Sequence, residues 1–116
     1  MKAYWNYDRE TDTFRVRFMP TKYKESVKIE RGLFLELDEE NKVMGLLIMN
    51  ASKFMNKTKD HFKGVEAVDF VVKARRDWID VDLKIKFNLR GKKDKYEISI
   101  GLPPSYLEEG EGNGEE

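Results

Sequence analysis

The sequence has no cysteine and no glutamine, and it contains only one histidine and three prolines in 116 residues. Without cysteine, disulfide frameworks, thiolate metal sites and thiol redox chemistry are excluded. No stretch of the chain approaches the ~18 apolar residues of a membrane span, and residues 1–6 lack the apolar run of a signal peptide. We therefore expect a cytoplasmic protein that makes no membrane contact.

Charge, by contrast, is abundant, at 38% of the residues. An average domain has roughly 25%, and high charge without glutamine or cysteine is typical of thermophile proteins, although a small domain with a large surface would also explain it. The net charge is zero but uneven, because five of the 22 acidic residues lie in residues 108–116, which hold no base. We expect a single globular domain over residues 1–107 and a disordered acidic tail over residues 108–116.

Apolar and polar residues alternate along the N-terminal half, which is the period of half-buried β-strands. Residues 14–18 read Phe-Arg-Val-Arg-Phe, and Pro20 ends this strand because proline has no N–H to donate. The next strand is expected over residues 27–37, with a bulge or bend at Gly32. Residues 43–49 are apolar on both faces, which indicates a central strand covered on both sides or by a partner subunit. With a short strand at residues 5–7, this part has four strands.

A helix is expected over about residues 51–63, capped by Asn50 and stopped by Gly64. Its apolar stripe consists of Ala51, Phe54, Met55, Thr58 and Phe62. The period then returns to two, which predicts three strands over residues 66–74, 79–89 and 96–102. The predicted fold class is α+β, mainly β: an antiparallel β-meander with one amphipathic helix between an N-terminal four-stranded part and a C-terminal three-stranded part.

Several features of residues 7–55 are shared with one known family. They are Tyr7-Asp8 with Asp12 in the first turn, the strand at residues 32–38, and the junction Gly-Leu-Leu-Ile-Met-Asn-Ala-Ser at residues 45–52. In these features the segment resembles the domain-of-unknown-function family 2283, and residues 65–102 lie outside the family pattern as a β-meander extension. The resemblance implies no catalytic residues, because no activity is established for the family. Some members resemble partners encoded beside small toxins, so it implies an interaction role, toxin-neutralising or regulatory.

No motif in the sequence predicts an enzyme or a cofactor. Phosphate-binding loops, glycine-rich dinucleotide loops and the Gly-x-Ser-x-Gly elbow are all missing from the sequence, and His61 stands alone on a lysine-rich segment. We expect no catalytic residue, no cofactor and no metal. One alternative is a Mg²⁺-dependent nuclease, since Asp69 followed by Asp82 and Lys84 resembles the restriction-endonuclease-like arrangement of two metal-binding carboxylates and a lysine. The same residues also fit the solvated face of an amphipathic strand.

Two non-catalytic functions fit the sequence better. The first is a homodimeric protein-interaction module, because the apolar surplus exceeds what one small sheet face can bury; its expected interface is Leu46, Leu47, Ile48, Met49, Phe54 and Met55. The alternative is a nucleic-acid-binding module that combines a basic strand face with aromatic stacking surfaces; its expected contacts are Arg15, Arg17, Lys22, Lys24, Tyr4, Trp5 and Tyr23. Acidic residues interrupt this basic stripe and the chain is neutral, so we favour the interaction module.

Overall fold

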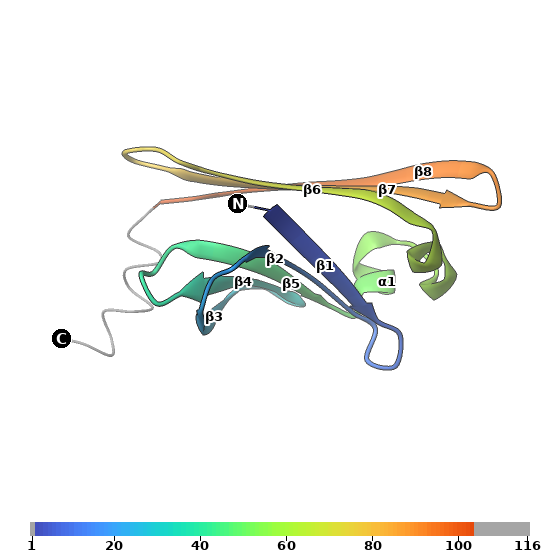
Figure 1. Ribbon diagram of the computed structural model, residues 1–116, viewed down its shortest axis with the longest axis horizontal. Helices are drawn as coiled ribbons and strands as arrows, with labels where there is room; N and C mark the ends of the chain where they lie inside the picture. The colour runs from blue at the N-terminus through green and yellow to red at the C-terminus, as the bar shows by residue number, and fades with distance from the viewer. Residues whose placement is uncertain (1, 104–116) are drawn as a thin grey trace.

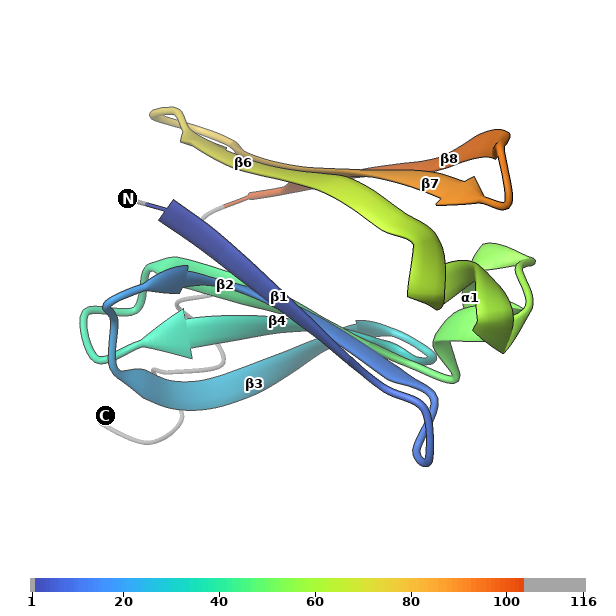
Figure 2. The ribbon, with the colours of Figure 1, turned by 45° about the vertical axis from the view of Figure 1, so that its right-hand side comes forward.

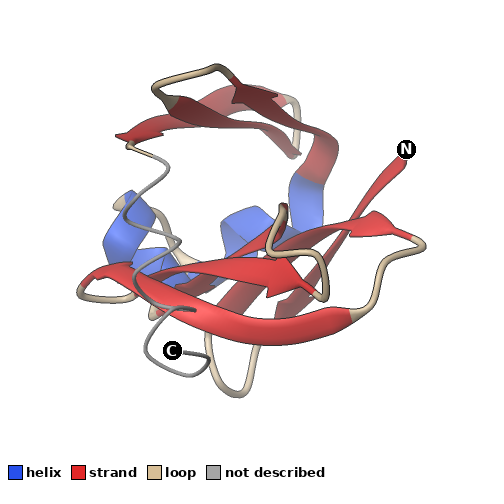
Figure 3. Ribbon diagram, turned by 90° about the vertical axis from the view of Figure 1, so that its left-hand side faces the viewer, coloured by secondary structure: helices blue, strands red, loops and turns tan. Residues whose placement is uncertain are grey.

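The computed structural model describes residues 2–103, so the predicted tail at 108–116 lies outside the described residues. Two antiparallel sheets lie face to face, and two short helices fill the space between them at one end (Figures 1 and 3). No helix in the described part is long and apolar enough to cross a membrane. In chain order the elements are β1 (Lys2–Asp8), β2 (Thr13–Met19), β3 (Tyr23–Glu30), β4 (Leu33–Asp38), β5 (Val43–Met49), α1 (Ala51–Met55), the 3-10 helix η1 (Lys59–Gly64), β6 (Val65–Ala74), β7 (Ile79–Leu89) and β8 (Lys92–Leu102).

The first sheet has five strands in the order β1-β2-β5-β4-β3. The predicted mainly-β, antiparallel class is confirmed, and β5 is central as expected. The predicted number of four strands in this sheet and the predicted meander connection both need correction. Residues 27–37 do not form one bent strand, because Arg31 and Gly32 make a tight turn between β3 and β4, with Gly32 at φ 84°. The chain therefore reverses there, and β5 enters between β2 and β4, so this sheet is not a simple meander.

The second sheet is the expected three-stranded meander, β6-β7-β8, and its register is continuous between β7 and β8. Its apolar face turns towards the first sheet, where both sheets contribute to one core. The rings of Phe18 in β2 and Phe70 in β6 lie 4.9 Å apart, which shows the direct contact between the layers. The fully buried core members from the two sheets include Phe14, Val16, Leu33, Leu35, Leu46, Ile48, Val81 and Ile85.

The helix prediction over residues 51–63 is wrong in its length. Asn56 takes a left-handed conformation at φ 57° and ends α1 after Met55. Its N–H donates to the Lys53 carbonyl, and the Lys57 N–H donates to the Ser52 carbonyl at 2.8 Å, which is the Schellman pattern of helix ends. A separate 3-10 helix follows, and Gly64 is its last residue.

Phe62 in η1 joins the helical end to both sheets. Its ring stacks on Tyr7 of β1 at 4.0 Å, lies 6.1 Å from Phe14 of β2 and meets Phe87 of β7 edge-on at 5.7 Å. The side chain is 4% exposed. Figure 2 shows the helical segment closing this end of the two-layer structure. The packing therefore fixes the relative position of the sheets.

Candidate functional site

The family-like residues of the first turn form one hydrogen-bonded cluster around Asp12. The Tyr7 hydroxyl donates to the Asp12 carboxylate at 2.6 Å, and Ser52 donates to it through its hydroxyl at 2.6 Å and its backbone N–H at 3.1 Å. Asn50 makes no side-chain cap, so the predicted capping by Asn50 is wrong and Asp12 takes that role from 40 residues away. This cluster joins the first hairpin to α1, and its role is structural.

The ionisation of this cluster follows from its contacts. Burial by itself would raise the pKa of Asp12, but hydrogen bonds from Ser52 and Tyr7 outweigh it and hold the pKa below its ordinary value of 3.8. Burial, together with the hydrogen bond to Asp12, raises the pKa of the Tyr7 hydroxyl. At neutral pH the cluster therefore contains one carboxylate and a protonated phenol.

The residues of the nuclease alternative lie on the outer face of the second sheet. Asp69 of β6 pairs with Lys84 of β7. Asp82 lies two residues before Lys84 on the same face of β7, opposite Val71 of β6. Lys84 forms an ion pair with Glu97 of β8 at 3.3 Å. Within residues 2–103, no group of three or more histidine or acidic side chains is placed to hold a metal ion. The arrangement is that of a charged, solvated strand face.

His61 caps the start of η1 through contacts with Thr58. Its Nδ1 accepts a hydrogen bond from the Thr58 N–H at 3.1 Å, and the Thr58 hydroxyl lies 2.8 Å from the same atom. The Nε2 atom lies 3.7 Å from the Asp94 carboxylate. Lys57 also pairs with Asp94, and a hydrogen bond from Lys57 lowers the pKa of that carboxyl. These contacts attach the helical segment to the first residues of β8.

A different group of side chains gathers on the outer face of the first sheet, the face turned away from the second sheet. One row across this face runs from Arg17 in β2 through Gly45 in β5 to Glu36 in β4. Arg15 lies on the same face, opposite Leu47. The alternation of residues 14–18 explains this, because Phe14 and Val16 point into the core.

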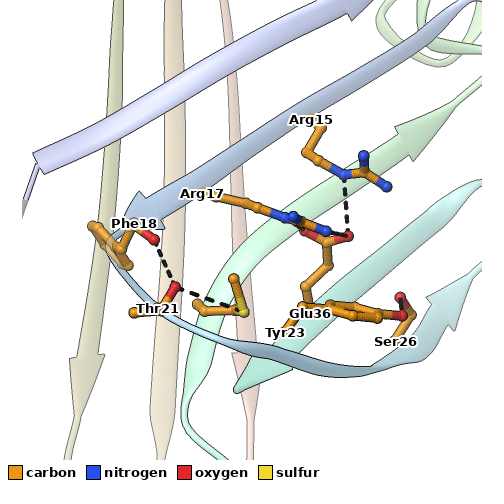
Figure 4. A network of polar contacts seen from close by, with 8 residues as sticks. Arg15, Arg17, Phe18, Thr21, Tyr23, Ser26 and Glu36 are labelled. Atoms are coloured by element: carbon orange, nitrogen blue, oxygen red, sulfur yellow. Dashed lines mark hydrogen bonds and ion pairs between the residues drawn. The ribbon is translucent and has the colours of Figure 1, made fainter. Parts of the chain in front are cut away.

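Glu36 binds both arginines. Its carboxylate accepts from Arg17 Nε at 2.7 Å, from Arg17 Nη2 at 3.1 Å and from Arg15 Nε at 3.2 Å (Figure 4). The Glu36 side chain is 1% exposed, whereas Arg17 is 28% and Arg15 is 42% exposed. The hydrogen bond with Glu36 raises the pKa of Arg17. A buried carboxylate thus fixes two guanidinium groups that still reach solvent.

Aromatic and apolar side chains surround these arginines. The Arg17 guanidinium carbon lies 5.1 Å from the centre of the Tyr23 ring, a cation–π contact. A groove of about 610 Å³ runs beside the arginines; it is lined by Tyr4, Trp5, Asn6, Arg15, Arg17, Met19 and Pro20. Among residues 2–103 there are seven exposed large apolar side chains, and five of them lie on this face or at its β1 edge: Tyr4, Trp5, Met19, Tyr23 and Met49. The other two are Val71 in β6 and Trp78 in the connection between β6 and β7.

The residues predicted for nucleic-acid binding are largely brought together. Tyr4, Trp5, Arg15 and Arg17 line the groove, and Tyr23 packs against Arg17. Lys22 and Lys24 are exposed but outside the groove, and Lys24 bonds to the Asn41 side chain at 2.9 Å.

The predicted dimer interface is divided by the fold. Leu46 and Ile48 are completely buried and Met55 is 3% exposed, because the second sheet and α1 cover them within one chain. Phe54 also packs against this core. Only Leu47 and Met49 lie on the outer face. Most of the apolar side chains that the sequence assigns to a dimer interface are thus buried within the single chain.

Sequence reasoning missed Glu36 and Gly45. Glu36 alternates with leucines like any solvent-facing strand residue, so nothing in the pattern reports its burial. Gly45 did carry a signal, since a glycine within a strand marks close approach by another group.

Comparisons with known proteins agree with the division into two sheets. Residues 5–52 match the family described as "Protein of unknown function (DUF2283)"; the match covers the first sheet from the middle of β1 onward and the start of α1. An uncharacterised protein of Methanocaldococcus jannaschii is 33% identical over 114 residues, covering 96% of this chain and 97% of that protein. A Methanosarcina mazei protein named "Putative hypoxanthine phosphoribosyltransferase" is 25% identical over 99 residues, covering 84% of this chain and 80% of that protein. No solved structure matches.

The resemblance predicted over residues 7–55 is confirmed by the family match, which has nearly the same bounds. The second sheet lies outside that match, yet the Methanocaldococcus jannaschii relative extends through it. The cluster of Tyr7, Asp12 and Ser52 explains why the matched segment continues past β5 into α1. The chain belongs to the DUF2283 family, with a second sheet completing its core.

Proposed function

We propose that the protein is a non-catalytic, homodimeric protein-interaction module that presents the outer face of the first sheet to a protein partner. The observation that carries the proposal is the gathering of five of the seven exposed large apolar side chains on this face or its edge. Protein interfaces are enriched in tyrosine, tryptophan, methionine and arginine, which are the residue types found here. Such a module would suit a toxin-neutralising or regulatory role.

Glu36 favours a protein partner over a nucleic acid. Its carboxylate engages both guanidinium groups, so Arg15, Arg17 and Glu36 together carry a single net positive charge. Binding to a phosphate backbone depends on many uncompensated cations, because counterion release drives it. An anchored arginine beside aromatic side chains, by contrast, is typical of the energetic centre of a protein interface.

Single-stranded nucleic acid is the second candidate, since the same groove offers two exposed aromatic rings beside two arginines. Bases can stack on such rings regardless of sequence. Neither candidate takes an activity from the name of the Methanosarcina mazei relative. The cytoplasmic location and thermophilic origin expected from the sequence stay predictions.

The test is capture of binding partners from the native host with tagged protein. Met49→Glu places a charge on the outer face, and Val71→Glu is its matched control on the second sheet, because the two parent side chains are 45% and 43% exposed. We expect one defined protein that resists nuclease and moderate salt, is lost with Met49→Glu and is kept with Val71→Glu. Retention of the same partner by both variants would contradict the proposed surface.

The same experiment separates the second candidate. A nucleic acid would be released steeply as salt rises, and Arg15→Ala together with Arg17→Ala would weaken its retention. Removing residues 108–116 would strengthen it, because five negative charges are lost.

A further inference from the structure

The two open sheets leave four edge strands, and these differ in how they are protected. An edge strand presents unpaired backbone N–H and carbonyl groups, which bulges, charges or neighbouring elements usually shield. The register of β3 shifts at two places and that of β6 at one. β1 packs beside β6, as Figure 2 also shows. β8 is the exception, because all 11 of its residues pair with β7 without any shift.

The two halves of β8 have different chemistry. Lys92, Lys93 and Lys95 supply charge to the first half, but residues 98–102 read Ile-Ser-Ile-Gly-Leu and carry none. Within the described chain, no backbone hydrogen bond reaches residues 98–102 apart from those of the ladder with β7. A straight, uncharged strand edge of this kind is a template for another strand.

We propose that residues 98–102 of β8 pair antiparallel with the same residues of a second copy, about a two-fold axis at Ile100. This inference rests on the homodimeric part of the proposed function and names the contact that forms the dimer. The pairing sets Ile98 opposite Leu102 of the partner, Ile100 opposite itself and Ser99 opposite Gly101. The two three-stranded sheets then join into one sheet of six strands through an isologous contact.

The alternation along β8 selects this axis. Ile98, Ile100 and Leu102 face the core, and Ser99 and Gly101 face outward, so the axis at Ile100 matches apolar with apolar and small with small. An axis at Ile98 would set Asp94 opposite Leu102. An axis at Tyr96 would set Lys92 opposite Ile100. Of the axes at Tyr96, Ile98 and Ile100, only the one at Ile100 sets no charged side chain of β8 opposite an apolar one.

A second copy is the preferred occupant because the strand is its own complement in this register. Pro103 then limits the pairing, since proline cannot donate to a continuing ladder. Five residues per strand is a small contact, so the association is expected to depend on protein concentration in the micromolar range.

The absence of native cysteine makes the test direct, because one introduced cysteine can link only to its copy in another molecule. Directly opposed residues on antiparallel strands have Cβ atoms about 4.5–5.5 Å apart, near the range a disulfide needs. Ile100→Cys should therefore form a covalent dimer under mild oxidation. Val71→Cys, on the far edge strand of the same sheet, should stay monomeric on a non-reducing gel, and Ser99→Cys should link more slowly than Ile100→Cys.

Two measurements on the unmodified protein accompany the cross-link. Sedimentation equilibrium should give twice the chain mass of 13.7 kDa. Amide exchange over residues 98–102 should slow as protein concentration rises, while exchange in β3 stays unchanged. These need no substitution, so a poorly folding Ile100→Cys variant would leave the inference testable.

The outcomes separate this inference from the proposed function. A monomer throughout the micromolar range would overturn both the β8 contact and the homodimer, while partner capture on the outer face would remain to be judged by the Met49→Glu variant. A dimer that Met49→Glu dissociates, without protection of residues 98–102, would overturn the β8 contact alone. A dimer with protected residues 98–102, together with a covalent link in the Ile100→Cys variant, would support it.

Discussion

Glu36 lies directly opposite Gly45, and its carboxylate occupies the space that a side chain at position 45 would need. A Cβ atom at residue 45 would lie 2.9 Å from Glu36 Oε1 and 2.6 Å from the Val16 carbonyl oxygen. The central strand therefore has to be bare at this point for the carboxylate to reach both arginines. One glycine in β5 thus decides how the outer face is organised.

Gly45→Ala should lower the free energy of unfolding by about 1–3 kcal/mol, because overpacking at a fixed backbone costs that much. The closest contact of the added methyl group is the backbone oxygen of Val16, which no rotamer change can move away. Urea denaturation at constant protein concentration measures the effect. Adding Glu36→Ala to the Gly45→Ala variant should not restore stability, because the contact with the Val16 carbonyl oxygen remains. Full recovery would show that the Glu36 carboxylate alone excludes a side chain at position 45.

Glu36→Gln should destabilise the protein by about 1–2 kcal/mol. Hydrogen bonds to charged groups contribute about 1.5–3 kcal/mol, but both arginines are partly exposed and can turn towards water, which reduces the loss. Freed from Glu36, the guanidinium groups should also bind inorganic phosphate and other anions better. Titration with phosphate would show this, and Lys84→Gln is a control that breaks an exposed pair on the other sheet.

Asp12→Asn should lower the free energy of unfolding by about 1.5–3 kcal/mol at neutral pH, since three donors lose a charged acceptor. Asparagine tolerates the left-handed conformation at this position (φ 55°), so the backbone is not strained by the change. Tyr7→Phe removes one of these donors and should cost less. Equal losses from the two changes would contradict a carboxylate-centred cluster.

The Asp12 contribution should also depend on pH. The folded-state pKa lies below the ordinary value of 3.8, so the unfolded chain binds the proton first and the stabilisation is complete above about pH 5. It is lost as the pH falls from there through the lowered pKa. The difference in unfolding free energy between the protein and Asp12→Asn should therefore shrink on acidification. Other acid-sensitive groups, such as Asp60 and Asp94, cancel in that difference.

Asn56→Gly and Asn56→Ala should differ in their effect on stability. Glycine adopts the left-handed conformation without steric cost, whereas alanine loses about 1 kcal/mol in it. We expect Asn56→Ala to lower the melting temperature and Asn56→Gly to leave it unchanged or raise it slightly. A matching loss in both variants would indicate that the Asn56 side chain, and not its backbone conformation, is what matters.

Local patterns in the sequence report some features of this fold and not others. The alternation of apolar and polar residues is a property of each strand by itself. The buried and exposed faces of residues 14–18 and of β6, β7 and β8 could therefore be predicted. The strand order was not, because the insertion of β5 between β2 and β4 depends on contacts distant in sequence. Asn56 is a weak stop signal beside Gly64, which explains the overlong helix.

The site shows the same limit. Arg15 and Arg17 were predictable from their shared strand face, and Tyr4 and Trp5 were predicted beside them as stacking surfaces. Glu36 was not, since its burial is produced by partners on two other strands. Leu46 and Ile48 were assigned to a dimer because the sequence cannot say whether an apolar face is covered by another chain or by a later part of its own.

Phe62 and the strands after it cover the apolar face of the first sheet, as a separate protein could. Among the described residues, those up to Met55 form the first sheet and α1, and those from Lys59 form η1 and the second sheet. The two parts meet through packed side chains, through the contacts of Arg9 with Asp60 and Lys59, and through the short link at residues 56–58. The two parts therefore resemble two proteins that bind each other and are joined by a short linker. Cutting the chain within this link should yield two fragments that reassemble in solution, because each would otherwise expose to water the apolar face that the other now covers.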